Sequence, residues 1–150
     1  MTGPAVRIIP YEDKYRDDMI FMILQAKDAL GRVPRLNDDL LDIRAHYLDR
    51  GDMFWLAVGA DGRVAGSVGY SLIDGAREAF LHRLFVKASL KRRGIGGALL
   101  RTAEESLKSR GVALARVHLG EPREQWFESY RFYEKHGYEE YAPRFMKKAL

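Results

Sequence analysis

Residues 84–97 read LFVKASLKRRGIGG, and this stretch decides the fold. Its first three residues are apolar and end a segment, residues 78–86, whose alternating pattern predicts a β-strand. A basic loop follows, and glycines at positions 94, 96 and 97 then open a segment with helical periodicity. The stretch therefore predicts a strand, a basic loop and a helix that begins on glycines.

A helix that begins in this way can bind an anion. About four backbone N–H groups at a helix N-terminus lack a partner inside the helix, and the terminus carries roughly half a positive charge. Glycine has no Cβ, so a phosphate group can approach the backbone closely. Arg92 and Arg93 can add charge-assisted hydrogen bonds. The stretch favours a small phosphorylated ligand, although a plain tight turn with solvated arginines stays open.

Three other phosphate-binding loops do not match the sequence. A Walker A loop requires Gly-x-x-x-x-Gly-Lys-Ser/Thr, which does not occur. A dinucleotide-binding fold requires Gly-x-Gly-x-x-Gly after the first strand of a βαβ unit, whereas four predicted strands precede these glycines. The partner motifs of a kinase glycine-rich loop are missing.

The pattern on either side of this stretch predicts an α+β fold with a mixed sheet and helices on both faces. Asn37 or Asp38 is the expected cap of the second helix, which should turn Leu40, Leu41, Ile43 and Tyr47 inward. The expected helices span residues 14–30, 38–49, 95–110 and 124–136. The expected strands span residues 6–10, 54–60, 64–73, 78–86, 114–119, 138–141 and 144–149.

Strict alternation along residues 78–86 makes a further prediction about side-chain direction. It places Phe80, His82, Leu84 and Val86 on one face of the strand. Ala79, Leu81, Arg83 and Phe85 should point to the other face.

Two motifs resemble those of the GNAT superfamily of N-acetyltransferases. Lys91-x-x-Gly94-x-Gly96 resembles the Gln/Arg-x-x-Gly-x-Gly/Ala motif that those proteins use for the pyrophosphate of coenzyme A. Residues 132–138, FYEKHGY, resemble the family's Tyr-Glu-Lys-x-Gly-Phe segment. The resemblance implies a mostly antiparallel sheet of about six to seven strands, splayed to form an acetyl-CoA cleft, and one N-acetyltransferase domain over residues 1–150.

The resemblance also implies which residues bind the donor, acetyl-CoA. Two positions depart from the family: Lys91 stands where Gln or Arg is usual, and Trp126 where an Asn often bonds the pantetheine arm, a contact that Ser129 or water would replace. The implied cofactor-binding residues are Leu84, Phe85, Val86, Lys91, Arg92, Arg93, Gly94, Ile95, Gly96, Gly97 and Ser129.

By the same resemblance, the acetyl group passes directly to a primary amine in a ternary complex. Tyr133 matches the family's general acid, and the Val86 N–H should stabilise the oxyanion. We favour Glu121 and His82 for the base, although a water chain would also serve. The chain has no cysteine, so a thiol-linked acetyl-enzyme is excluded.

Composition sets the remaining expectations. The net charge of +4 is a mild excess, no apolar run is long enough to span a membrane, and there is no thiolate for a metal. We expect no nucleic-acid or membrane partner, no metal, and by elimination a cytoplasmic location. Dimers are common among similar proteins, which leaves a homodimer open. The acceptor is a small-molecule or peptide amine that the sequence does not identify.

Two rival functions stay open at this point. A non-catalytic acyl-CoA-binding sensor would keep the same cleft and release no coenzyme A. An RNA-binding module built on residues 87–93 would retain RNA in a salt-sensitive manner even when acetyl-CoA is saturating.

Overall fold

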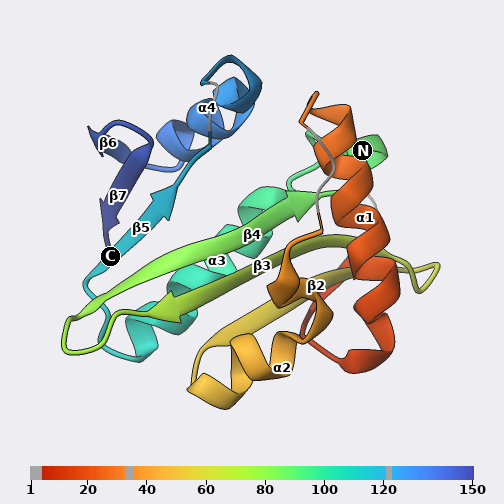
Figure 1. Cartoon of the computed structure of the whole chain (residues 1–150), viewed down its shortest axis with the longest axis horizontal. Helices are drawn as coiled ribbons and strands as arrows, with labels where there is room; N and C mark the ends of the chain where they lie inside the picture. The colour runs from red at the N-terminus through yellow and green to blue at the C-terminus, as the bar shows by residue number, and fades with distance from the viewer. Residues whose placement is uncertain (1–4, 33–35, 121–122) are drawn as a thin grey trace.

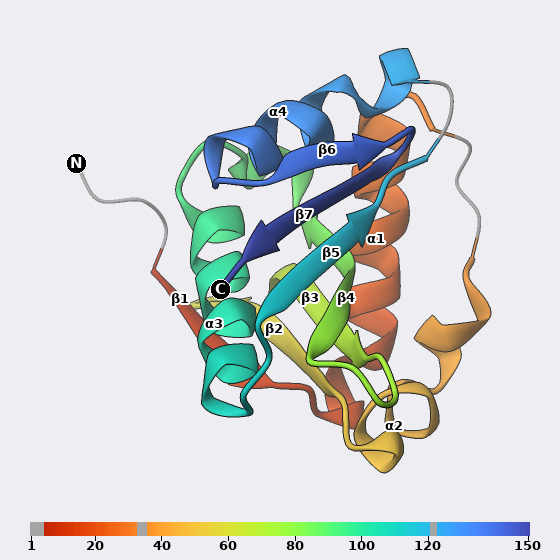
Figure 2. The same ribbon diagram turned by 90° about the vertical axis from the view of Figure 1, so that its left-hand side faces the viewer.

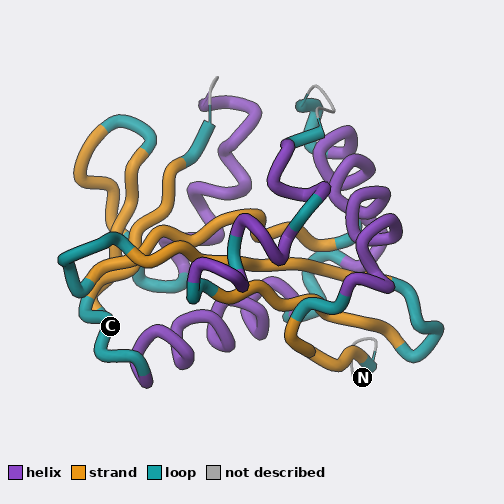
Figure 3. Tube along the Cα trace, turned by 60° about the horizontal axis from the view of Figure 1, so that its bottom comes forward, coloured by secondary structure: helices purple, strands orange, loops and turns teal. Residues whose placement is uncertain are grey.

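The computed structural model describes residues 5–32, 36–120 and 123–150 as a mixed sheet with helices on both faces (Figure 1, Figure 3), which confirms the predicted α+β class. The seven-stranded sheet has the order β1-β2-β3-β4-β5-β7-β6, and only β4 and β5 are parallel neighbours. The strands are β1 (Val6–Pro10), β2 (Met53–Gly59), β3 (Val64–Leu72), β4 (Glu78–Val86), β5 (Leu114–His118), β6 (Glu139–Ala142) and β7 (Phe145–Ala149). The α-helices are α1 (Arg16–Ala29), α2 (Ile43–His46), α3 (Ile95–Ser109) and α4 (Phe127–Lys135).

Each face of the sheet has its own hydrophobic core. On one face, Leu99, Leu100 and Leu107 of α3 are fully buried against β-strand residues, as the helical stripe predicted. On the other face, Met19 and Ile23 of α1 are fully buried among residues of β2. The two cores hold β3 and β4 between helices, so the ends of these strands are fixed in position.

The predicted helix over residues 38–49 is wrong. The segment forms a 3₁₀ turn at Asp38–Leu41, the short α2 and a second 3₁₀ turn at Leu48–Arg50. Asp42 interrupts it because its backbone is not helical (φ −148°, ψ 78°) and its carboxylate accepts a hydrogen bond from the Ala45 N–H at 3.1 Å. Leu41, expected inside, is consequently 47% exposed, whereas Leu40, Ile43 and Tyr47 are buried as expected.

A β-bulge in β4 overturns the predicted side-chain faces. Arg83 has φ 54°, and the register with β3 shifts between Ser67 and Gly69. His82 and Arg83 therefore both point toward the face covered by α1 and α2, and Leu84 and Val86 pack on the α3 side instead. Hydrogen bonds fix the bulge: the Ser67 hydroxyl donates to the Arg83 carbonyl at 2.7 Å, and the Arg83 guanidinium donates twice to Asp39.

Strand β4 is paired very differently along its two edges. Its pairing with β3 runs from Ala79 to Val86, whereas its pairing with β5 covers only three residues, from Glu78 to Phe80. Beyond these three residues, β5 diverges from β4 toward α4 (Figure 1; Figure 2 shows the same elements turned by 90°). The predicted splay of the sheet is thus present, and it lies next to the start of α3. None of the helices in the described ranges has the length and apolar character that crossing a membrane requires.

Candidate functional site

The start of α3 presents free backbone donors. Gly94 caps the helix with φ 81°, a conformation that glycine adopts without strain, and its carbonyl accepts the first helical hydrogen bond from the Ala98 N–H at 3.0 Å. Within the described ranges, the N–H groups of Ile95, Gly96 and Gly97 donate to no backbone carbonyl, and no side chain caps the helix. These three amides and the helix dipole form a site suited to an anion.

The amides lie beside a cavity of about 780 Å³, between β4, α1, α3 and α4. Every predicted cofactor-binding residue except Arg93, which is exposed, lines this cavity. A Cβ on Gly96 would lie 3.2 Å from Phe132 and 3.4 Å from Val86, so a side chain here would project into the space between β4 and α4. The lining residues that sequence reasoning missed are Ala26, Leu30, Arg32, Leu90, Arg101, Glu128, Phe132, Lys135 and His136.

The open edge of β4 forms a second set of backbone donors and acceptors. Lys87 donates its N–H to the Ala65 carbonyl of β3 at 2.8 Å, and Phe85 is the register partner of Ser67. Because backbone groups in an antiparallel pair alternate in direction, the polar groups of Leu84 and Val86 then face the splay. An extended ligand with amide groups can pair with this edge as a strand would.

Basic side chains predominate around the cavity. Arg92 and Arg101 line it and are exposed, and Arg92 adopts φ 61° in the loop that leads to Gly94. Lys91 forms an ion pair with Glu128 of α4 at 2.8 Å, so this predicted phosphate ligand already has an anionic partner. The positive charge favours a ligand with several phosphate groups.

Tyr133 lies in the α3-side core, 7% exposed, with its ring edge-on to Phe132 and Tyr138. Burial raises the pKa of Tyr133 well above the ordinary value, and the charge of Arg32 offsets only part of this rise. The hydroxyl therefore stays protonated at neutral pH, as a proton donor requires. Tyr133 itself does not line the cavity, although its neighbour Phe132 does.

The predicted base His82 is not brought together with Tyr133. His82 lies near Tyr47 on the opposite face of the sheet, and its Nε2 is 2.7 Å from the Ser71 hydroxyl. Burial, aided by the charge of Arg83, lowers the pKa of His82 to about 4. Glu121 lies outside the described residues.

Trp126, which stands where the family often has Asn, contacts an arginine instead of the cavity. The Arg32 guanidinium lies 3.5 Å from the Trp126 ring centroid and donates a hydrogen bond to the Ser129 hydroxyl at 3.0 Å. Ser129, predicted to contact pantetheine, thus already accepts a hydrogen bond from Arg32. No local sequence signal indicates this cluster, because Arg32 and Ser129 are 97 positions apart.

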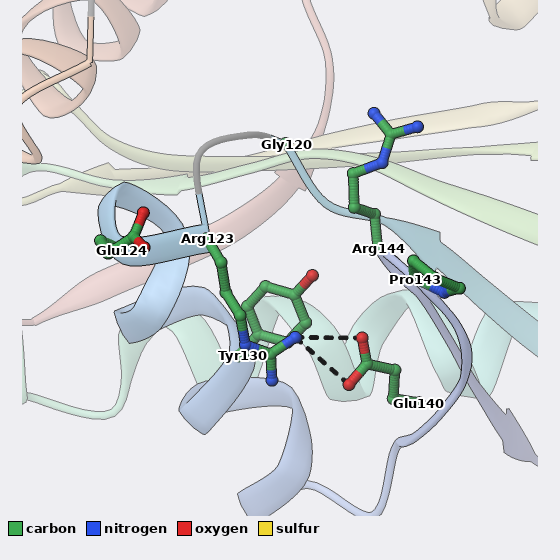
Figure 4. Close-up of a pocket in the computed structure, with 7 residues that line it drawn as sticks. All are labelled: Gly120, Arg123, Glu124, Tyr130, Glu140, Pro143 and Arg144. Atoms are coloured by element: carbon green, nitrogen blue, oxygen red, sulfur yellow. Dashed lines mark hydrogen bonds and ion pairs between the residues drawn. The ribbon is translucent and has the colours of Figure 1, made fainter.

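A second cavity, of about 630 Å³, lies between the end of β5, α4 and the turn that joins β6 to β7 (Figure 4). Arg123 crosses it to pair with Glu140 at 3.0 Å, and its guanidinium lies 3.9 Å from the Tyr130 ring centroid. The two cavities share no lining residue. Because the Arg123 and Glu140 charges neutralise each other, the second cavity is less suited to an anion than the first.

Solved structures of similar fold include three bacterial or archaeal acetyltransferases. A GNAT-family acetyltransferase from Staphylococcus aureus Mu50 has a TM-score of 0.88 at 23% identity, with 97% of this chain and 99% of that chain covered. An acetyltransferase from Streptococcus agalactiae 2603 has a TM-score of 0.86 at 19% identity, with 97% and 98% covered. The PaiA N-acetyltransferase from Thermoplasma acidophilum, in complex with coenzyme A, has a TM-score of 0.75 at 20% identity, with 97% and 99% covered.

A search of curated proteins finds no match to the sequence. The sequence model of the Acetyltransferase (GNAT) family, by contrast, matches residues 19–138, which include β4, the basic loop, α3 and α4. The match covers well over half of the chain and agrees with the free amides at the start of α3. The chain therefore belongs to the acetyltransferase (GNAT) family.

Proposed function

We propose that this protein transfers the acetyl group of acetyl-CoA directly to a primary amine of a small molecule or peptide. The observation that carries the proposal is the set of unpartnered amides at Ile95, Gly96 and Gly97, which adjoin a basic cavity beside the open edge of β4. A pyrophosphate fits the amides, and an extended pantetheine arm fits the edge. The coenzyme A complex of the Thermoplasma relative supports this choice of donor.

The donor would supply a thioester, and the residues of the chain would assist its attack by an amine. The outward N–H of Val86 would donate a hydrogen bond to the oxyanion that develops on the acyl carbon. The Tyr133 hydroxyl would protonate the departing sulfur, a role that its raised pKa supports because the group keeps its proton at neutral pH. A shift of Tyr133 toward the cavity would accompany donor binding.

The proton of the attacking amine needs an acceptor. An amine of lysine type has a pKa of about 10.4 and must lose a proton before it can attack. His82 is neutral at pH 7 because its pKa is lowered to about 4, but such a weak base accepts a proton less readily than one near 7. Glu121 and a water chain are the other routes that we propose.

The first test measures donor binding and turnover separately. Calorimetric titration with acetyl-CoA should show binding, and thiol release in the presence of an amine panel should show transfer. Replacing Tyr133 with Phe should lower kcat about 100-fold, which is typical for the loss of a general acid, with nearly unchanged affinity for acetyl-CoA. Unchanged kcat in Tyr133→Phe would remove the residue from this role.

The rival sensor function has one observation in its favour, namely that Tyr133 lies outside the cavity lining. A sensor would bind acetyl-CoA with the same amides and would release no thiol with any amine. Retention of RNA that persists at saturating acetyl-CoA would instead support the RNA-binding module. Absence of acetyl-CoA binding in the titration would overturn the proposed function itself.

A further inference from the structure

Arg32, just beyond the C-terminus of α1, is a buried arginine that lines the cavity. It is only 9% exposed. One face of its guanidinium lies over Trp126, 3.5 Å from the ring centroid, and one terminal nitrogen donates to Ser129 at 3.0 Å. The stacking and the hydrogen bond fix the plane of the guanidinium, so its remaining N–H groups point in fixed directions.

The charge of Arg32 lacks an anionic partner among the described residues. No carboxylate in the described ranges lies within ion-pair distance of it, and its Nε is buried without any hydrogen-bond partner. Glu128 exerts some electrostatic influence on Arg32 but is itself paired with Lys91 at 2.8 Å. Burial lowers the pKa of Arg32 to about 10, so the group is still charged at neutral pH. Buried arginines are almost always paired, which makes this one unusual.

Arg32 lies toward the opposite end of α4 from the Gly97 amide. A Cβ on Gly97 would lie 3.3 Å from His136, at the end of α4, whereas Arg32 contacts Ser129 and Trp126, at the start of the same helix. From Ser129 to His136, seven residues correspond to about 10 Å along a helix axis. An anion at Arg32 would thus lie toward the other end of α4 from a phosphate group bound to the Gly97 amide, near the point where Lys91 of the basic loop reaches Glu128.

We propose that Arg32 binds a carboxylate carried by one of the two reactants, and that it thereby selects the substrate. The inference rests on the proposed function, because it assigns the far end of the same cavity to the reacting groups. A carboxylate matches the planar fork of a guanidinium and can accept two parallel hydrogen bonds from it. A small movement of the Arg32 side chain over the Trp126 ring would allow its Nε and a terminal nitrogen to donate together.

The carboxylate has two chemical sources. It is either the carboxylate of an amino-acid-like acceptor, next to the amine that is acetylated, or the distal carboxylate of a dicarboxylic acyl group on coenzyme A. A neutral acceptor with a neutral acyl group would leave the Arg32 charge unpaired in the occupied site, at a cost to binding.

The experiment compares matched pairs of reactants. The acceptor arm pairs L-amino acids with the corresponding amino acid amides, each with acetyl-CoA. The donor arm pairs succinyl-CoA with butyryl-CoA on one amine. We expect wild-type kcat/KM to favour the carboxylated member of one arm by about 100-fold, the scale of a buried charge pair. Arg32→Met should abolish that preference and lower kcat/KM for the neutral member by no more than about 3-fold.

Two further variants separate the role of Arg32 from a general effect on structure. Arg32→Lys keeps the charge but loses the fork, so it should restore part of the preference. Arg131→Met removes an exposed arginine of α4 that does not line the cavity, and it should leave the preference unchanged. Thermal unfolding of each variant checks that the chain folds. If Arg32→Met fails to fold, the test rests on Arg32→Lys. An undiminished preference for the carboxylated reactant in Arg32→Lys would then overturn the proposal.

The outcomes also distinguish this proposal from the proposed function. If wild-type protein binds acetyl-CoA and acetylates amines but shows no preference in either arm, the carboxylate site is overturned and the proposed function stands. Equal losses with carboxylated and neutral reactants in Arg32→Met overturn it as well. If wild-type protein neither binds acetyl-CoA nor releases thiol, the proposed function is overturned first, and the carboxylate site with it.

Discussion

The two edges of β4 show how one strand serves both stability and binding. Toward β3, the strand is paired along almost its whole length, and the bulge at Arg83 is held by Ser67 and Asp39. Toward β5, the pairing stops at Phe80 and leaves the polar groups of the next residues without a strand partner. An unpaired edge inside a protein costs free energy unless another group pairs with it. The edge toward β3, here called the rigid edge, therefore holds the open edge toward β5 in a conformation with which a ligand can pair.

The largest expected effect is on donor binding and concerns Gly96, one of two glycines on either side of Val86. Gly96→Val should raise the Kd for acetyl-CoA at least about 100-fold. A branched side chain would enter the space between Phe132 and Val86 and cover the amides. Each charge-assisted hydrogen bond lost in this way is worth about 1.5–3 kcal/mol. Gly96→Ala is the matched control. Its single methyl group needs a shift of only a few tenths of an ångström, so the Kd should change by less than about 3-fold. Calorimetry measures both.

Gly66, the register partner of Val86 on β3, should affect stability and not donor binding when it is replaced. A Cβ there would lie 2.7 Å from Leu99 and 3.0 Å from the Phe85 carbonyl. Gly66→Ala should therefore lower the free energy of unfolding by about 1–3 kcal/mol, the usual cost of overpacking, with little change in Kd at temperatures where the protein is folded. If both glycine sites affected the same property, the distinction between the two edges would be lost.

The sequence predicted these two edges unequally well. The strand, the basic loop and the glycine-led helix were predicted with near-correct bounds, because each has a local signature in residues 78–97. The bulge at Arg83 was not, because alternation assumes a period of two and Arg83 carries no residue-type signal for a positive φ. It is set by tertiary contacts with Ser67 and Asp39.

The candidate site shows the same limit. Local motifs identified the residues around the start of α3, and all but Arg93 of those implied for the donor line the cavity. The other end of the cavity depends on the pairing of Arg32 with Trp126 and Ser129, which are distant in sequence. Residues that acquire a role only through such contacts cannot be read from spacing. Similarly, the helical pattern places Asp42 inside a helix, because the capping role of this residue depends on where the chain turns.

A smaller effect is expected from His82, which precedes the bulge on the side of the rigid edge. The pKa of His82 is lowered to about 4 in the folded protein, below the ordinary value of 6.5. The unfolded chain therefore takes up a proton that the folded protein does not, as pH falls from about 6.5 to about 4. Stability from this group is fully present above pH 6.5 and is lost over that range, with a slope of at most about 1.4 kcal/mol per pH unit.

Chemical denaturation at several pH values measures this loss. His82→Gln keeps a hydrogen-bonding group near Ser71 but cannot titrate, so it should flatten the decline in unfolding free energy between pH 6.5 and 4. His136→Gln is the control, since burial lowers the pKa of that half-buried histidine at the cavity by a smaller amount. An unchanged slope in His82→Gln would mean that the rigid side of the bulge opens to water more readily than the packing around His82 indicates.

The smallest expected effect concerns the ion pair between Lys91 and Glu128 at the mouth of the cavity. Both side chains reach solvent, so either single replacement should change the free energy of unfolding by less than about 1 kcal/mol. Binding should respond in opposite directions. Glu128→Gln removes the anion that holds Lys91 and should lower the Kd for acetyl-CoA about 2- to 5-fold, whereas Lys91→Met should raise it by a similar factor. Both changes in Kd should shrink at 0.5 M salt, because exposed charges are screened. If the changes persisted at that salt concentration, Lys91 would bind the donor from a position that solvent does not reach.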